Sequence, residues 1–245
     1  TTRAAALNGQ QWIGGIYPPG DARLHWADDI IRRAIGAYGC ELWADANDVA
    51  ASSGDAVETW PARCGVPPTQ ATVGKRPTFQ RGASVSSLEF GGVDDALSTG
   101  VDLSATNGAS VYVVARLDST AATTVLFEYS AAYHTNAGLV CGVDSSAQFW
   151  TGMGPGSSAL SYRNSTATVP TTPAVYAARY LRDTPAQLTQ HTVFGGELVE
   201  NTSFSAQKTG ANTDNIYEIV IVPAYVPDIA HNLIIRALAV KGGLL

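Results

Sequence analysis

The most constraining feature of this chain is a long series of short segments rich in β-branched and aromatic residues. These segments recur from about position 41 to position 223, and Gly, Pro, Asn or Asp residues bound them. Such boundary residues tolerate positive φ or hydrogen-bond to their own backbone, so the pattern predicts strands joined by tight turns. After a first strand that begins at Glu41, we expect strands at 57–60, 78–80, 87–90, 109–117, 123–129, 138–143, 147–151, 174–181 and 216–223.

One further hairpin is expected over residues 187–203. Its two arms flank Gly195-Gly196, and both central positions of a type I′ turn favour residues that accept positive φ. We therefore expect two antiparallel strands joined by this glycine pair.

Helical periodicity occurs only near the two ends of the chain. From Asp21 to Ala37 apolar residues recur every three or four positions, with Asp21 as a candidate N-cap. A second helix is expected after Pro227-Asp228, ending at Gly242-Gly243. Its predicted apolar face consists of Ile229, Leu233, Ala237 and Val240, with Ile234 and Leu238 beside it.

Many strands with helices only at the ends predict an all-β fold: one β-sandwich of two antiparallel sheets. The length of 245 residues suits a single sandwich, and the low charged fraction of 15% suits strands and turns. We expect residues 1–39 to form an arm and an amphipathic helix used for attachment. Residues 40–245 would form the sandwich and its short C-terminal helix.

The order of residues between positions 41 and 97 resembles that of LamG-like, concanavalin A-like lectin/glucanase domains of tailed-phage virion proteins. The resemblance implies a concanavalin A-like jelly roll, and it extends more weakly over residues 40–245. The residues that carry the match are Leu42, Trp43, Asp45, Ala46, Asp48, Trp60, Gln70, Arg76, Pro77, Leu88, Phe90, Gly92, Val93, Asp94, Asp95 and Leu97.

Charge and hydropathy exclude several partner classes. The net charge is −6, and among fifteen basic residues only Arg32-Arg33 and Lys75-Arg76 are adjacent, so no basic stripe is available for a phosphate backbone. No segment approaches about eighteen consecutive apolar residues, and the first residues lack the pattern of a signal peptide. We expect no nucleic-acid binding, no membrane insertion and no signal-directed export.

Three cysteines, Cys40, Cys64 and Cys141, are far apart in sequence and form no metal-binding spacing with the four histidines. The odd number favours free thiols that act as small buried apolar groups, while a Cys40–Cys64 bridge stays open. We expect no metal and no cofactor.

The carboxylates do not indicate catalysis. A retaining glycosidase needs two carboxylates close together, and the E-x-D-x-x-E spacing of the resembled glucanases is absent. Glu197 and Glu200 are three positions apart in a predicted hairpin, and Glu218 is alone in an apolar strand. Asp45, Asp48 and the Asp94-Asp95 pair are best explained as turn residues, with calcium binding by the pair as an alternative. We expect no catalytic residues.

Glycan binding is more credible because aromatic residues and amides occur together near predicted loops. The candidate carbohydrate-binding residues are Tyr133, His134, Asn136, Trp150, Tyr162 and Arg163. The competing interpretation is that Phe149 or Trp150 fills the core, since alternation in a strand allows only one of them to point inward.

The N-terminal arm carries large apolar side chains without periodicity, which need a surface to lie on. These candidate attachment residues are Trp12, Ile13, Ile16 and Tyr17. With the resemblance, they favour a non-enzymatic virion protein: a head decoration, a head fibre or a tail component. The partners would be capsid or tail subunits, with copies of the chain repeated by the symmetry of the particle. The alternatives are a glycan-binding receptor module and, third, a glucanase-like hydrolase.

Overall fold

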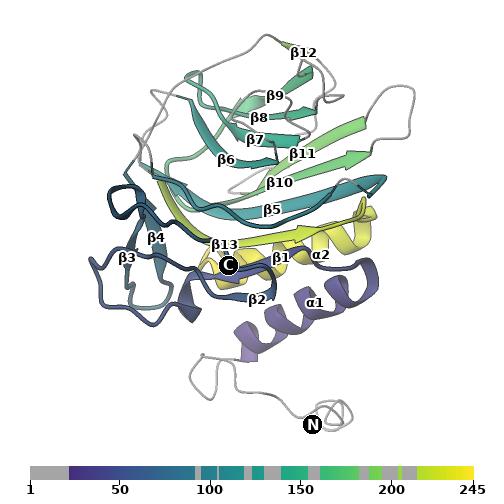
Figure 1. The fold of residues 1–245 in the computed structure, drawn as a ribbon. Helices are drawn as coiled ribbons and strands as arrows, with labels where there is room; N and C mark the ends of the chain where they lie inside the picture. The colour runs from purple at the N-terminus through teal and green to yellow at the C-terminus, as the bar shows by residue number, and fades with distance from the viewer. Residues whose placement is uncertain are drawn as a thin grey trace, which may run out of the picture.

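The computed structural model describes residues 22–91, 95–103, 105–118, 123–129, 139–153, 161–181, 188–194, 204–205 and 214–245. It consists of two antiparallel sheets packed face to face, with two helices on one outer side (Figure 1). The predicted concanavalin A-like β-sandwich is therefore confirmed. The helices add a third layer.

The larger sheet has eight strands in the order β11-β10-β5-β13-β1-β2, with β4 paired to β13 and β3 paired to β4. The strands of this sheet are β1 (Leu42–Asp45), β2 (Ala62–Gly65), β3 (Thr78–Gln80), β4 (Ser87–Phe90), β5 (Gly108–Leu117), β10 (Ala174–Leu181), β11 (Leu188–Phe194) and β13 (Asp214–Val222).

The smaller sheet has five strands in the order β12-β9-β8-β7-β6. These strands are β6 (Thr124–Tyr129), β7 (Leu139–Val143), β8 (Gln148–Met153), β9 (Ser161–Thr168) and β12 (Phe204–Ser205).

The first of two hydrophobic cores fills the space between the sheets. Phe149 of β8 and Tyr176 of β10 meet across it with ring centroids 5.3 Å apart. The Tyr180 hydroxyl of β10 donates a 2.9 Å hydrogen bond to the carbonyl oxygen of Val140 in β7. Buried aromatic packing and a satisfied hydroxyl thus join the two sheets.

The second core lies between the larger sheet and the helices α1 (Ala22–Tyr38) and α2 (Asp228–Lys241) (Figure 1). Helix α1 buries Ala27, Ile31 and Ala34, as its apolar period predicts. Gly39 follows α1 with φ of +90° and donates its N–H to the Ile35 oxygen at 2.9 Å, which ends the helix.

The face predicted for helix α2 is only partly confirmed. Ala237, Ile234 and Leu238 are buried as predicted, but Ile229 is 81% exposed and Leu233 is 39% exposed. His231 and Lys241, which the prediction left out, are buried. The apolar residues of this helix surround most of its circumference, so periodicity alone does not select the packed side. Ion pairs and hydrogen bonds with the sheet place the histidine and the lysine inward.

Two strand predictions also need correction. Residues 57–60 form no strand, although Val57 and Trp60 are buried as expected, because their backbone groups bond to Pro77 and Pro68 in an irregular loop. Strands β2 and β9 were not predicted, since the polar sequence of 161–168 resembles a loop. The N-cap position Asp21 and the Gly195–Ser203 part of the hairpin lie outside the described residues.

Candidate functional site

The densest group of charges in the described structure lies between the larger sheet and the helices. We call it the ion cluster. Its residues come from six elements that are distant in sequence, the short helix η2 (Ala46–Asp48) among them. They are Asp28 of α1, Asp45 of β1, Asp48 of η2, Arg63 of β2, Glu218 of β13 and Lys241 of α2.

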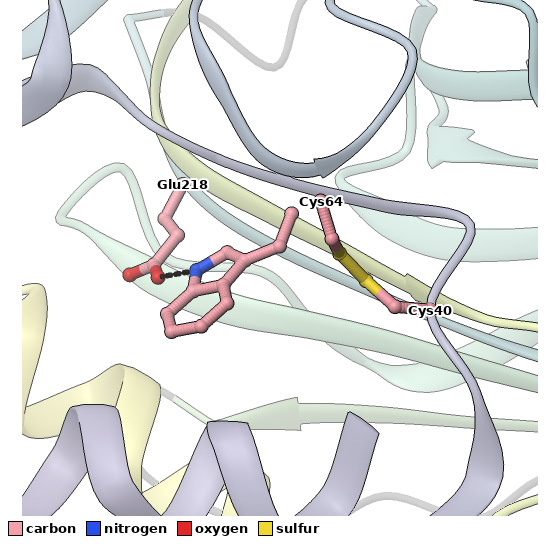
Figure 2. Close-up of a disulfide and its surroundings, with 4 residues drawn as sticks. Cys40, Cys64 and Glu218 are labelled. Carbon is pink, nitrogen blue, oxygen red and sulfur yellow. Dashed lines mark hydrogen bonds between the residues drawn. A yellow bond between two sulfur atoms is a disulfide. The ribbon is translucent and has the colours of Figure 1, made fainter. Parts of the chain in front are cut away.

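Lys241 is the centre of the ion cluster. Its Nζ lies 2.8 Å from Asp28 Oδ1, 2.8 Å from Asp45 Oδ2 and 2.5 Å from Glu218 Oε1. The same Glu218 oxygen accepts a 2.7 Å hydrogen bond from the indole N–H of Trp43 (Figure 2). The lysine is only 2% exposed, so these partners replace the water that it loses on burial.

Arg63 is the second cation of the ion cluster, and a β-bulge directs its side chain into the cluster. Trp43 pairs with Cys64 while Ala44 pairs with Ala62, so Arg63 is an extra residue in the ladder. A bulge of this kind redirects a side chain. The bulge lets the guanidinium join the ion cluster while the neighbouring Cys64 packs in the helix–sheet core.

The Arg63 guanidinium holds three aspartates. It bonds Asp48 through Nε at 2.6 Å and Nη2 at 2.9 Å, a bidentate pair. Its Nη1 lies 2.9 Å from Asp28 Oδ1, and its Nη2 lies 3.1 Å from Asp45 Oδ2. The guanidinium also lies over the Trp43 ring, 4.8 Å from the ring centroid.

The environment shifts the pKa values of two carboxyls in opposite directions. Burial raises the pKa of Glu218 to about 7, although Lys241 opposes this change. Burial also acts to raise the pKa of Asp45, but the charges of Lys241 and Arg63 outweigh it, and the Asp45 pKa falls below its usual value. Of these two carboxyls, Glu218 therefore gains a proton first as the pH falls.

The ion cluster is largely buried. Helix α1, three strands and α2 cover it, and Arg63 is its most exposed cation at 12%. Asp28, Asp45 and Glu218 are at most 3% exposed, and Asp48 is 13% exposed. Shifted pKa values often mark reactive sites, but buried ion networks produce them as well.

Asp45 and Asp48 were predicted to cap turns. Asp45 does so, since its Oδ1 accepts the Asn47 N–H at 2.9 Å at the start of η2. The prediction did not include the ion pairs of either residue with Arg63. One signal in the sequence could have revealed part of the cluster, because Asp28 and Lys241 interrupt apolar helical faces beside Ile31 and Leu238.

The preference for free thiols at Cys40 and Cys64 is wrong, because the structure joins them in a disulfide (Figure 2). Pairing of β1 with β2 brings the two Cα atoms to 6.4 Å, within the range that a disulfide requires. Cys141 is free and buried, and burial raises the pKa of its thiol to about 12. One disulfide and one buried, unreactive thiol thus account for the three cysteines.

The polar residues of the resembled segment support its own loops. Gln70 bonds the Ala96 carbonyl at 2.9 Å and accepts the Thr72 N–H at 3.0 Å. Arg76 donates to the Gln70 carbonyl at 2.9 Å. Asp95 accepts the Gly91 N–H at 2.6 Å, a turn contact. Asp94 lies outside the described residues, and among those described no group of acidic, His or Cys side chains is placed to hold a metal.

The predicted carbohydrate-binding residues are only partly placed. Strands β8 and β9 pair, with Trp150 opposite Asn164, Thr151 opposite Arg163 and Gly152 opposite Tyr162. The structure thus brings the backbone positions of Trp150, Tyr162 and Arg163 together. Tyr133, His134 and Asn136 lie outside the described residues.

Phe149 and Trp150 point to opposite faces of the smaller sheet, as alternation requires. Phe149 lies in the core between the sheets, and Trp150 packs with Val140 and Val125 on the outer side. Gly142 faces Trp150 in the ladder, and a Cβ there would come within 3.0 Å of the indole. Trp150 is nonetheless 3% exposed, so a sugar could stack on it only if its present neighbours moved.

The candidate attachment residues Trp12, Ile13, Ile16 and Tyr17 also lie outside the described residues. Within the described ranges, neither helix has the length and apolar character needed to cross a membrane.

No family model matches the sequence, and no curated protein matches it. Among solved structures, a sialidase of Trypanosoma rangeli with a bound difluoro nononic acid derivative is 12% identical, with a TM-score of 0.50. That match covers 83% of this chain and 33% of the sialidase. A botulinum neurotoxin type C structure is 10% identical, with a TM-score of 0.46, over 75% of this chain and 51% of that one.

This chain therefore spans about a third of the sialidase chain and about half of the neurotoxin chain. At such identities, the sialidase similarity concerns the fold. The class defined by the sheets and by this comparison is a lectin-like β-sandwich.

Proposed function

We propose that this chain is a non-enzymatic structural protein of a tailed-phage particle, as a head decoration, a head fibre or a tail component. The observation that carries the non-enzymatic part is the position of the ion cluster. The largest group of carboxylates among the described residues lies between the larger sheet and the helices, largely buried, and is bound to Lys241 and Arg63. The charges of the described core thus serve the stability of a scaffold.

The resemblance between positions 41 and 97 supports the link to a virion. In this segment Trp43, Trp60 and Leu88 are buried, while Gln70 and Arg76 order a loop. The described part of this segment therefore serves as a scaffold, which is the role that the resemblance to virion domains implies. The proposed location is the virion.

Helix α1 supports attachment through the chain that precedes it. Asp28 binds both Lys241 and Arg63, and Ile31 packs in the helix–sheet core. Force applied to the residues before α1 would therefore be transmitted to the sandwich through these contacts. An anchored helix of this kind suits an arm that holds the module on capsid or tail subunits.

The test compares particles that carry the full chain with particles that carry a chain lacking residues 1–20. We expect both proteins to fold, and only the full chain to copurify with particles by mass spectrometry. A matched variant that replaces Trp12, Ile13, Ile16 and Tyr17 by alanine should fail in the same way. Normal incorporation of both altered proteins, or absence of the full chain from purified particles, would refute the proposal.

Glycan binding is the second candidate, because pairing of β8 with β9 gathers three of the predicted positions. A glycan array should then give a signal that the Trp150→Ala, Tyr162→Ala and Arg163→Ala variants lose. Trp26→Ala is the matched control, since Trp26 is an exposed tryptophan on helix α1. An array without signal for the intact chain would reject this candidate and leave the structural role untouched.

Hydrolysis is tested separately with a panel of polysaccharides. The proposal expects no release of reducing ends. Release that a single Glu197→Gln or Glu200→Gln change abolishes would overturn the non-enzymatic assignment.

A further inference from the structure

We infer that the Cys40–Cys64 disulfide is a redox lock that keeps strand β2 and helix α1 docked on the sandwich. Reduction by a dithiol releases both elements, while the two sheets stay folded. The inference is independent of the proposed function, because it rests on the contacts of the disulfide and the ion cluster.

The first step is the position of the disulfide. Cys40 lies between the end of α1 and the start of β1, and Cys64 lies in β2 opposite Trp43. The bond therefore connects the exit of the helix to β2. Both cysteines are half-buried and pack at the margin of the helix–sheet core.

The second step is the weak backbone ladder that holds β2. This strand has four residues and lies at the end of the larger sheet, where β1 is its described partner. The ladder contains three residue pairs and is interrupted by the bulge at Arg63. Short edge strands with a bulge have few ladder hydrogen bonds to lose. The restraint on β2 therefore comes mainly from the disulfide and from the ion pairs of Arg63 with the aspartates of the ion cluster.

The third step is the consequence for helix α1. Arg63 is adjacent to Cys64 and lies 2.9 Å from Asp28 of α1. If β2 moves away, the guanidinium leaves, and the three remaining buried carboxylates share Lys241. Uncompensated buried charge is unfavourable, so the helix carrying Asp28 separates from the sheet.

The fourth step is that the change stays local. Neither Cys40 nor Cys64 belongs to the core between the sheets, which is centred on β5, β10 and the smaller sheet. Cys141 does belong to that core, but it is buried and its raised pKa disfavours the reactive thiolate. Exchange therefore takes place at the Cys40–Cys64 bond.

The chemistry is ordinary thiol–disulfide exchange. One thiolate of the dithiol attacks a sulfur of the bond and forms a mixed disulfide, and the other cysteine sulfur leaves and takes up a proton. The second thiol of the reductant then displaces the first cysteine. Two electrons and two protons pass to Cys40 and Cys64, and the reductant becomes a cyclic disulfide.

The experiment is hydrogen exchange with mass spectrometry on the folded full chain, with and without dithiothreitol. We expect amide exchange in β2 and α1 to become at least about tenfold faster on reduction, and exchange in β5 and β10 to stay unchanged. Equal rates in α1 and β2 under both conditions would overturn the inference. Faster exchange in every strand together would also overturn it, because the bond would then control global stability.

Two variants separate the lock from the ion cluster. In oxidised Arg63→Met, we expect faster exchange in α1 while β2 keeps its protection, because the disulfide is intact. If α1 exchange does not change, the lock does not act through Arg63 and the inference fails. A Cys40→Ser/Cys64→Ser double variant should match the reduced wild type, and Cys141→Ala should respond to dithiothreitol as the wild type does.

Discussion

Replacement of Lys241 by methionine tests the ion cluster most directly. Methionine keeps the length and apolar stem of the side chain but removes the charge that lies within 2.8 Å of three carboxylates. Removing one partner from a buried ion network typically costs about 3–5 kcal/mol of unfolding free energy. We expect a loss in this range at pH 8, above the pKa of about 7 that Glu218 has in the wild type.

The loss should depend on pH because Glu218 can take up a proton. Burial raises its pKa to about 7 even with Lys241 present, and Lys241 lowers that pKa. Without the lysine the folded-state pKa rises further, so the variant binds a proton above pH 7 that the wild type does not. Stability of the variant relative to wild type therefore falls as the pH rises through this window, by up to about 1.4 kcal/mol per pH unit.

The assay is guanidinium chloride unfolding followed by tryptophan fluorescence at pH 6 and pH 8, with the disulfide kept intact. Lys75→Met is the matched control, since Lys75 is exposed, and we expect its effect to stay within about 0.5 kcal/mol. An equal loss in both variants, or a Lys241→Met loss that is the same at both pH values, would refute the reasoning. Adding Glu218→Gln to Lys241→Met should recover part of the stability, because it removes the carboxylate that is most costly to ionise.

Three further outcomes follow from the same structure. Because the pKa of Glu218 is raised, the wild type loses stability as the pH rises from about 4.5 to 7. Glu218→Gln lacks this titration, so its free energy of unfolding should rise by about 3 kcal/mol relative to wild type between those pH values. Unfolding measured as a function of pH checks this. Ile234→Ala should lower the free energy of unfolding by about 2–5 kcal/mol in denaturant melts, because Ile234 is buried. Ile229→Ala should change it by less than about 0.5 kcal/mol, because Ile229 is exposed. Equal losses in the two variants would contradict the observed packed face of α2. Gly65→Ala should lower the free energy of unfolding by about 2 kcal/mol or more, because φ is +78° and a Cβ would lie 1.9 Å from a backbone oxygen. Gly74→Ala is the control, since a Cβ there meets open space, and it should be tolerated in the same melts.

Much of the architecture could be predicted because its signals are local. The β-branched run of 109–117 became β5 at Gly108–Leu117, and the apolar period after Asp21 became α1 at Ala22–Tyr38. Periods of 2.0 and 3.6 residues follow directly from backbone geometry. The two-sheet sandwich with helices at both ends follows from the number and order of these segments.

The interior of the helix layer could not be predicted in the same way. Glu218 was recognised as an isolated acid in an apolar strand, but its partners Trp43 and Lys241 are 175 and 23 positions away. Arg63 reaches the ion cluster through a bulge, and sequence alternation does not reveal which residue a ladder leaves unpaired. The glycan and attachment residues were chosen by chemical type, and their assignment stays a prediction.

By itself, the sequence of this protein determined where both helices and most of the strands form, because these elements depend on neighbouring residues. The tertiary structure alone decided that Lys241 points inward, that Cys40 meets Cys64 and that Asp45 joins two cations. These contacts depend on which strands pair and in what register. That choice minimises the free energy of the whole chain, so no single segment contains it.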